Sequence, residues 1–205
     1  YGFKLYDQEL YRVECPMRNY LSGERETGTV LMQPLHESLA QEIDDDPTIL
    51  DTWRQTSRDK WVQAYEDHPA VQNALPEERD LLLPIVIYMD ATKFQLRDSL
   101  LVLTVHIVNS HRRHLTFAVP KSCWCDCGCG GWCTLFPLFS VVGWSIEWAM
   151  RGQNPYKRHD LEPLDAFREE VSGKLVKCKF VVVDINGDWS ELSNRWGLTQ
   201  WNATL

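Results

Sequence analysis

Five of the chain's seven cysteines lie between Cys123 and Cys133, in the run CWCDCGCGGWC. Thiols at this density form a disulfide knot, a metal site or a redox device, and the redox compartment decides among them. Disulfide-rich secreted folds spread their cysteines through a smaller chain, whereas Cys15 and Cys178 lie far from the run. The sequence opens at Tyr1 with neither a methionine nor a secretory signal, so we expect a fragment or a processed product, and removal of a signal peptide stays an open alternative. A reducing, intracellular location, nuclear or cytoplasmic, is therefore predicted.

The spacing of these cysteines differs from the usual structural zinc signature, in which ligands are paired as C-x2-C. In an extended backbone, the alternating cysteines at 123, 125, 127 and 129 would all place their thiols on one face. The intervening glycines allow the chain to turn back instead and bring Cys133 towards the others. Four of the five thiolates could then hold Zn²⁺, and soft thiolates also accept copper(I). We predict a zinc site with its ligands among Cys123, Cys125, Cys127, Cys129 and Cys133.

Length and composition indicate a folded protein. The chain has 205 residues, 44% of them hydrophobic, with nine tryptophans, which is enough to bury a substantial core. A net charge of -8 argues against electrostatic binding of nucleic acid by the surface as a whole, although a local basic patch is compatible with this charge. The longest apolar stretch, from Thr134 to Met150, contains Pro137, Gly143 and Glu147. A span needs about 20 apolar residues, so no membrane partner is expected.

The first 80 residues predict a helical or irregular region. Asp46 can cap a helix and Pro47 can fill its first turn, so a helix is expected from about Pro47 to Glu66. Between Cys15 and Glu42 the pattern is typical of loops or short elements. A second region, residues 81–205, carries the cysteine-rich insert at residues 121–134.

Regular elements are clearer after Leu81. Apolar runs predict strands at residues 85–89, 100–108 and 114–119, with a polar turn at 109–113 making the last two a hairpin. Residues 135–150 have the pattern of a core-facing helix, and a short helix is expected at 164–172. The run at 180–183 predicts a further strand. Asp90 ends the first of these strands, and Asp184 and Asp188 lie at the end of the last.

Three strands, a helix and a fourth strand returning beside the first form an α/β mixed sheet that resembles the ribonuclease H-like fold. The resemblance implies a β-β-β-α-β core with one catalytic aspartate on the first strand and a second at the end of the fourth. Asp90 and Asp188, with Asp184 as the rival, occupy the matching places.

A pair of neighbouring carboxylates by itself suggests a site for a divalent cation. They repel one another at low dielectric, and a divalent cation between them relieves the repulsion. Mg²⁺ or Mn²⁺ would suit such a pair together with substrate phosphate oxygens. Aspartates at strand ends also cap helices and close turns, and Asn186-Gly187-Asp188 is an ordinary turn sequence. Both interpretations stay open at this point.

The chain also resembles part of a DDE-type transposase of eukaryotic mobile elements. The runs that carry the likeness lie between Asp67 and Trp201: DHPAVQNAL, LPIVIYMDATKF, DSLLVLTVHIVN, VVVDINGDWSEL and NRWG. The resemblance implies metal-dependent phosphodiester cleavage or strand transfer on DNA in the intact parent. It also implies a third acidic residue on a later helix, and the chain ends at Leu205 before any such helix. We therefore expect a C-terminally truncated core that is inactive as a fragment.

Histidines and tryptophans give weaker signals. His111 and His114, beside Arg112 and Arg113, are expected to be solvent-facing turn residues, and His106 a hydrogen-bonded core histidine. Among the tryptophans, Trp124 and Trp132 flank the cysteine run and are the best candidates for exposed recognition residues.

Three interpretations remain. The first is a transposase-derived domain with Asp90 and Asp188 as metal-binding carboxylates. The second is a non-enzymatic, zinc-stabilised module that binds nucleic acid or protein. The third, a thiol-based redox or metal-storage protein, leaves the α/β core unexplained.

Overall fold

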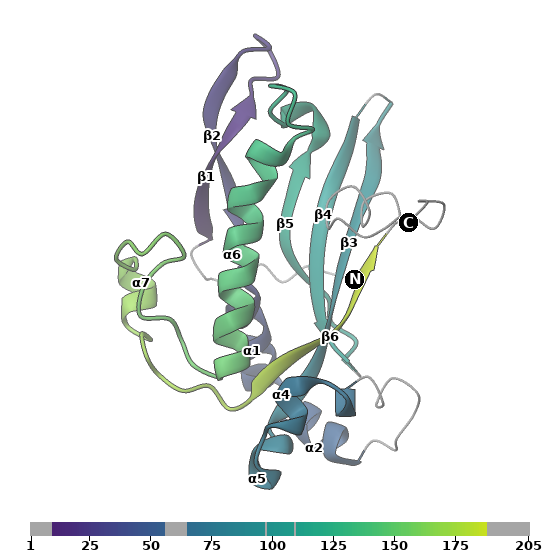
Figure 1. Cartoon of the computed structure of the whole chain (residues 1–205), viewed down its shortest axis with the longest axis vertical. Coiled ribbons are helices and arrows are strands. Elements are labelled where there is room, and N and C mark those ends of the chain that lie inside the picture. Colours follow the sequence, from purple (N-terminus) through teal and green to yellow (C-terminus); the bar gives the residue numbers. More distant parts are fainter. Residues whose placement is uncertain (1–9, 56–64, 97, 109, 188–205) are drawn as a thin grey trace.

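The computed structural model describes residues 10–55, 65–96, 98–108 and 110–187. Within these ranges the chain forms a mixed α/β structure with two sheets and several helices (Figure 1). In chain order the elements are β1 (Tyr11–Arg18), β2 (Arg25–Met32), α1 (Leu35–Asp45), α2 (Thr48–Gln55), α4 (Pro69–Gln72), α5 (Pro76–Arg79), β3 (Leu82–Gln95), β4 (Asp98–Ile107), β5 (His114–Pro120), the 3-10 turn η1 (Lys121–Cys123), α6 (Trp132–Arg151), α7 (Ala166–Glu169) and β6 (Lys179–Gly187).

The larger sheet has four strands in the order β5-β4-β3-β6. β3 pairs antiparallel with β4, and β4 pairs antiparallel with β5. β6 returns after α6 and α7 to pair with β3 in parallel. This arrangement confirms the predicted order of three strands, a helix and a fourth strand beside the first. The four apolar runs that predicted it, at 85–89, 100–108, 114–119 and 180–183, lie in these strands except for Val108, which follows the end of β4.

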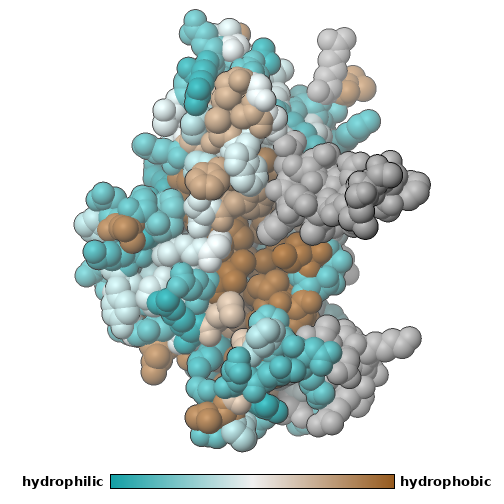
Figure 2. All heavy atoms as spheres, viewed as in Figure 1, coloured by the Kyte–Doolittle hydropathy of each residue, from teal (hydrophilic) through white to brown (hydrophobic). Residues whose placement is uncertain are grey.

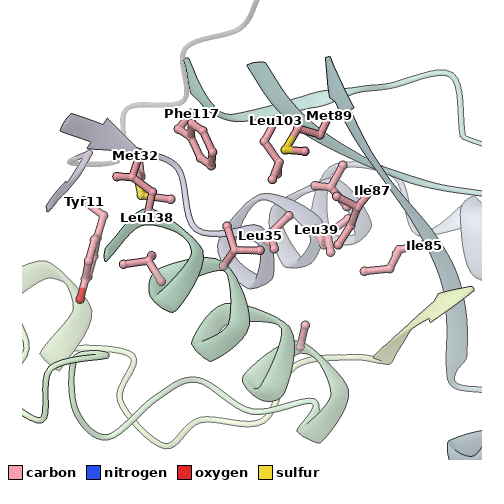
Figure 3. Packing of buried hydrophobic residues seen from close by; sticks show 14 of the residues in the cluster. Tyr11, Met32, Leu35, Leu39, Ile85, Ile87, Met89, Leu103, Phe117 and Leu138 are labelled. Atoms are coloured by element: carbon pink, nitrogen blue, oxygen red, sulfur yellow. The ribbon is translucent and has the colours of Figure 1, made fainter. Parts of the chain in front are cut away.

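The main core lies on one face of this sheet. Alternate residues of β3 point into it, and Ile85, Ile87 and Met89 are completely buried. Helices α1 and α6 cover this face, and the β1–β2 hairpin continues the layer beside β5 (Figure 1). In Figure 3, Leu35 and Leu39 of α1 lie between the strands and α6.

A smaller core lies on the opposite face, at the end where β3 begins. Tyr65 and Val71 pack there on Leu82 and Val181. The Tyr65 hydroxyl donates to the carbonyl of Leu82 at 2.9 Å, which fixes this region to the start of β3.

The N-terminal region differs from the sequence prediction. Residues expected to form loops or short elements make the antiparallel hairpin of β1 and β2. Tyr11, Val13 and Cys15 alternate along β1 and are at most 2% exposed. They belong to the same core as the strands of the larger sheet, so this region is an integral layer of the fold.

The predicted helix after Asp46 is confirmed at its beginning. α2 starts at Thr48, whose backbone N–H donates to Asp46 Oδ1 at 3.2 Å, as capping requires. The middle of the predicted helix, residues 56–64, lies outside the described residues.

Helix α6 is the longest helix of the described chain. Its inner face, with Leu138, Val141, Val142, Ser145 and Ala149, is buried, as expected of a core-facing helix. Apolar residues also gather on the outer side of α6 and beside it towards β6 (Figure 2). By length and hydropathy alone α6 would qualify as a membrane span, but the core helix of a soluble protein passes the same test.

Candidate metal centre

The cysteine run connects η1 to the first turn of α6. Gly128, Gly130 and Gly131 have φ angles of 91°, 62° and 87°, in the left-handed region that L side chains rarely adopt. At Gly131 a Cβ would also lie 2.5 Å from Cε3 of Trp124. The glycines therefore let the chain turn back on itself, as the sequence analysis predicted.

The turn brings four thiols together. The Sγ atoms of Cys125, Cys127, Cys129 and Cys133 all lie within 4.8 Å of one another, and those of Cys127 and Cys133 are 3.7 Å apart. Four sulfurs placed tetrahedrally about 2.3 Å from one zinc ion would be about 3.8 Å apart. The group is thus close to the size that zinc requires. Cys123, the fifth predicted ligand, ends η1 and lies outside the group.

Hydrogen bonds within the group shift the pKa values of its thiols in opposite directions. The backbone N–H of Cys133, in the first turn of α6, points at Cys129 Sγ over 3.4 Å and lowers the pKa of Cys129 to about 6. Hydrogen bonds to Cys129 and then to Cys127 raise the pKa of Cys133 to about 12. One thiol ionises readily, whereas further ionisation builds like charge in a small volume. A bound cation would relieve this repulsion, and zinc binds thiolates rather than thiols.

The loop is anchored to the N-terminal hairpin. Cys125 donates its backbone N–H to Thr134 Oγ1 at 2.9 Å, and the Thr134 hydroxyl donates to the carbonyl of Pro16 in β1 at 2.5 Å. A β-bridge joins Met17 to Trp124. The sequence gives no signal for this role of Thr134, because an apolar helical pattern does not indicate that one of its hydroxyls connects a loop to a strand.

A further contact at the hairpin tip is an ion pair. The Arg18 guanidinium lies 3.5 Å from the Asp126 carboxylate, and both side chains are about half exposed, at 47% and 58%. Exposed pairs of this kind contribute little to stability. The hydrogen bonds through Thr134 are therefore the stronger link between the metal loop and β1.

The two tryptophans that flank the loop differ in exposure. Trp132 is 42% exposed and packs its ring against Phe136 and Phe139 at centroid distances of 6.0 Å and 5.9 Å. Trp124 is 8% exposed, beneath Gly131, with the Lys121 ammonium over its ring. Trp132 is therefore exposed, as predicted, and its role in recognition stays a prediction. The predicted exposure is wrong for Trp124, which is part of the core.

Two of the predicted carboxylates, Asp90 and Asp184, lie on the larger sheet, on the face away from the main core. Asp90 was predicted to end its strand, which is wrong: β3 continues for five residues beyond it, paired with β4. The Asp90 side chain accepts hydrogen bonds from the Tyr88 hydroxyl at 3.2 Å and from the backbone N–H of Ala91 at 2.7 Å. Asp184 is exposed on β6 and pairs in register with Val86, on the same face as Asp90. Four residues of strand separate the two positions, which is roughly 13 Å. Asp188 lies outside the described residues.

Two histidines have environments that the sequence did not predict. His114 is 7% exposed, and its Nε2 lies 2.6 Å from Oε2 of the fully buried Glu42 in α1. The expectation of a solvent-facing turn residue was wrong, because α1 packs over this end of β5. His106 Nδ1 is buried without a hydrogen-bond partner in the described part of the chain, although a hydrogen-bonded core histidine was predicted. His111 is exposed, as expected.

The cysteine group is thus the site whose parts the fold brings together. Among the described residues, no other group of three or more potential metal ligands is found. Comparisons of the chain with protein-family models, with curated proteins and with solved structures found no match.

Proposed function

We propose that this chain is a non-enzymatic, zinc-stabilised α/β interaction module. The observation that supports it is the convergence of Cys125, Cys127, Cys129 and Cys133 within 4.8 Å. Four protein thiolates would complete the tetrahedral shell of zinc and leave no position for water or substrate. A closed site of this kind has a structural role.

Zinc is preferred to copper(I) because of the number of ligands. Both metals accept soft thiolates, so sulfur alone does not separate them. Zinc in structural sites is almost always four-coordinate and tetrahedral, and the turn provides one ligand for each corner. The metal would join the loop to the first turn of α6 through Cys133, while Thr134 joins both to β1.

The surface that such a zinc site would hold in place is aromatic. Trp132 and Phe136 are 42% and 58% exposed on the outer side of the first turns of α6. Aromatic residues are enriched where proteins bind each other, and a net charge of -8 disfavours a nucleic acid as the partner. We propose a protein as the partner of this surface.

Metal analysis of the purified chain tests the zinc proposal. Roughly one zinc ion per chain is expected, and cobalt(II) in its place should give the thiolate charge-transfer absorption of a tetrahedral sulfur site. Replacing Cys125, Cys129 or Cys133 with serine should abolish stoichiometric binding. Cys123→Ser is the matched control, because this cysteine lies in the same run but outside the group, and it should retain the zinc. Metal-free protein purified under reducing conditions that takes up no zinc would refute the proposal.

A second candidate function rests on the strand order. The order β5-β4-β3-β6, with β6 parallel to β3 and Asp90 on the side of β3 away from the main core, supports a ribonuclease H-like, transposase-derived domain. In the intact parent such a domain would bind Mg²⁺ or Mn²⁺ and act on DNA. Asp184 is a poor partner for Asp90 because of the four-residue offset, which leaves Asp188 as the candidate.

Titration with Mn²⁺ distinguishes this candidate from the first. If it is right, Asp90→Asn and Asp188→Asn each abolish Mn²⁺ binding, whereas Asp184→Asn has no effect. Unchanged binding in Asp90→Asn, or no binding by the native chain, would remove the support for a carboxylate metal site in this chain.

A further inference from the structure

The four clustered thiols differ in their access to solvent. Cys127 is exposed, Cys129 and Cys133 are half-buried, and Cys125 is buried. Oxidants reach sulfur from solvent, and their reaction with thiols requires the thiolate. In a zinc-bound group every sulfur is a thiolate, so exposure determines which one reacts first. Cys127 is therefore the first target.

The geometry also offers Cys133 as a partner for Cys127, although the other two thiols of the group lie within 4.8 Å as well. Its sulfur lies 3.7 Å from that of Cys133, close enough for direct attack after a small movement. Cys129 is held differently, with its Sγ near the backbone N–H of Cys133 at 3.4 Å and the carbonyl of Cys125 at 3.6 Å. Cys125 is buried, and its backbone N–H is hydrogen-bonded to Thr134 Oγ1.

We propose that the cysteine group is a peroxide-sensitive zinc switch, in which hydrogen peroxide converts Cys127 and Cys133 into a disulfide and thereby releases the metal. The inference rests on the proposed zinc site and adds its regulation.

The chemistry has two steps. The Cys127 thiolate attacks one oxygen of hydrogen peroxide, the O–O bond breaks, and a sulfenic acid and hydroxide form. The Cys133 thiolate then attacks the Cys127 sulfur, the S–S bond forms, and the S–O bond breaks to release a second hydroxide. Two protons from solvent convert the hydroxides to water. Two sulfurs are oxidised, one peroxide is reduced, and zinc is left with two protein ligands and dissociates.

The expected consequence is local. Cys133 belongs to the first turn of α6, and Cys127 lies in the loop, so the new bond keeps these two segments joined. Cys125 and Cys129 then no longer bind a shared metal ion. Trp132, next to Cys133, is the exposed ring closest in sequence to the change, and its fluorescence should respond.

The test uses the zinc-loaded chain and hydrogen peroxide in small increments. A chromophoric zinc indicator should report about one zinc ion released per peroxide consumed. Trypsin leaves residues 122–151 as one peptide containing all five clustered cysteines, because no lysine or arginine interrupts it. After alkylation of the remaining thiols, fragment-ion sequencing should find a Cys127–Cys133 disulfide and alkyl groups on Cys123, Cys125 and Cys129. Dithiothreitol with added zinc should restore the starting state.

Two variants sharpen the result. Cys123→Ser should load and release zinc like the native chain. Cys127→Ala lacks one of the four proposed ligands and should load zinc more weakly, and peroxide should release the zinc that it does hold more slowly, on the order of tenfold. If Cys127→Ala fails to load zinc, disulfide mapping in the native chain still tests whether Cys127 and Cys133 form the disulfide. A disulfide between other cysteines, or peroxide consumption without zinc release, would overturn the switch while leaving the zinc site intact. Absence of zinc before oxidation would refute the proposed function itself.

Discussion

At the scale of single residues, the Thr134 hydroxyl is the one most directly tied to the metal centre. It is completely buried and satisfies both the N–H of Cys125 and the carbonyl of Pro16. We expect Thr134→Val to leave both groups unpaired, to lower stability by about 1–3 kcal/mol, and to weaken zinc binding roughly tenfold or more. Urea unfolding and competition with a zinc chelator measure the two effects.

Thr116→Val is the matched control for that substitution. Thr116 is 3% exposed, and its hydroxyl has no hydrogen-bond partner in the described residues. Replacing an unpaired buried hydroxyl with a methyl group should be neutral or stabilising. Equal losses in the two variants would show that the Thr134 hydrogen bonds do not explain its effect.

His36 gives a second prediction at this scale, for the dependence of stability on pH. Burial first, and then the Arg168 cation, lower the pKa of His36 from 6.5 to about 3. The unfolded chain therefore binds a proton between these pH values while the folded chain does not. Stability should fall as the pH decreases through this window, with a contribution of up to about 1.4 kcal/mol per pH unit.

The comparison that isolates His36 is His36→Asn, which cannot titrate. Nδ1 of His36 lies 2.8 Å from Ser145 Oγ, and the side-chain amide of asparagine can also hydrogen-bond there. Urea unfolding between pH 4 and pH 7 should show a shallower loss of stability in the variant. Identical pH profiles would mean that His36 does not carry the effect.

At the scale of elements, the beginning of α6 depends on a glycine. Gly131 precedes the helix with a φ of 87°, and a Cβ there would meet the Trp124 ring at 2.5 Å. Gly131→Ala should therefore destabilise the chain by about 1–3 kcal/mol and weaken zinc binding. In contrast, Gly143 lies within α6 and has open space around it. Gly143→Ala should stabilise the chain by roughly 0.5–1 kcal/mol, as measured by urea unfolding. Opposite signs are expected, and a loss in both variants would contradict this account of the loop.

How far the sequence predicts the elements depends on where their partners lie. Strands β3, β4, β5 and β6 and helix α6 were predictable, because continuous apolar runs and a helical repeat are local signals. β1 has the alternation of a strand at Tyr11, Val13 and Cys15, but Pro16 and charged neighbours obscured it. The burial of His114 was beyond prediction, because it depends on Glu42, 72 residues away.

The metal site was predictable in part, as the secondary structure was. Glycines between the cysteines implied the turn, and four of the five cysteines meet there. Which cysteine stays out could not be inferred from spacing alone, because η1 sets the direction of Cys123. The relative positions of Asp90 and Asp184 were also not predictable from the sequence. Their strands are neighbours as predicted, but a register shift in the pairing of β3 with β6 fixes Asp184 opposite Val86.

At the scale of the whole molecule, the N-terminal region and the sheet share one core. Tyr11, Met32 and Leu35 are at most 1% exposed, and with α1 they cover strand residues such as Ile87 and Phe117 (Figure 3). The main sheet would lose much of this cover in a chain that begins at Leu81. Since hydrophobic burial dominates stability, we expect residues 81–205 alone to lack a cooperative urea transition and to bind a hydrophobic dye. The full chain should unfold in a single transition under the same conditions, with near-ultraviolet circular dichroism as the probe of packing. A cooperative transition with a native-like spectrum for residues 81–205 would show instead that the hairpin and α1 are an appendage to a core that is stable without them.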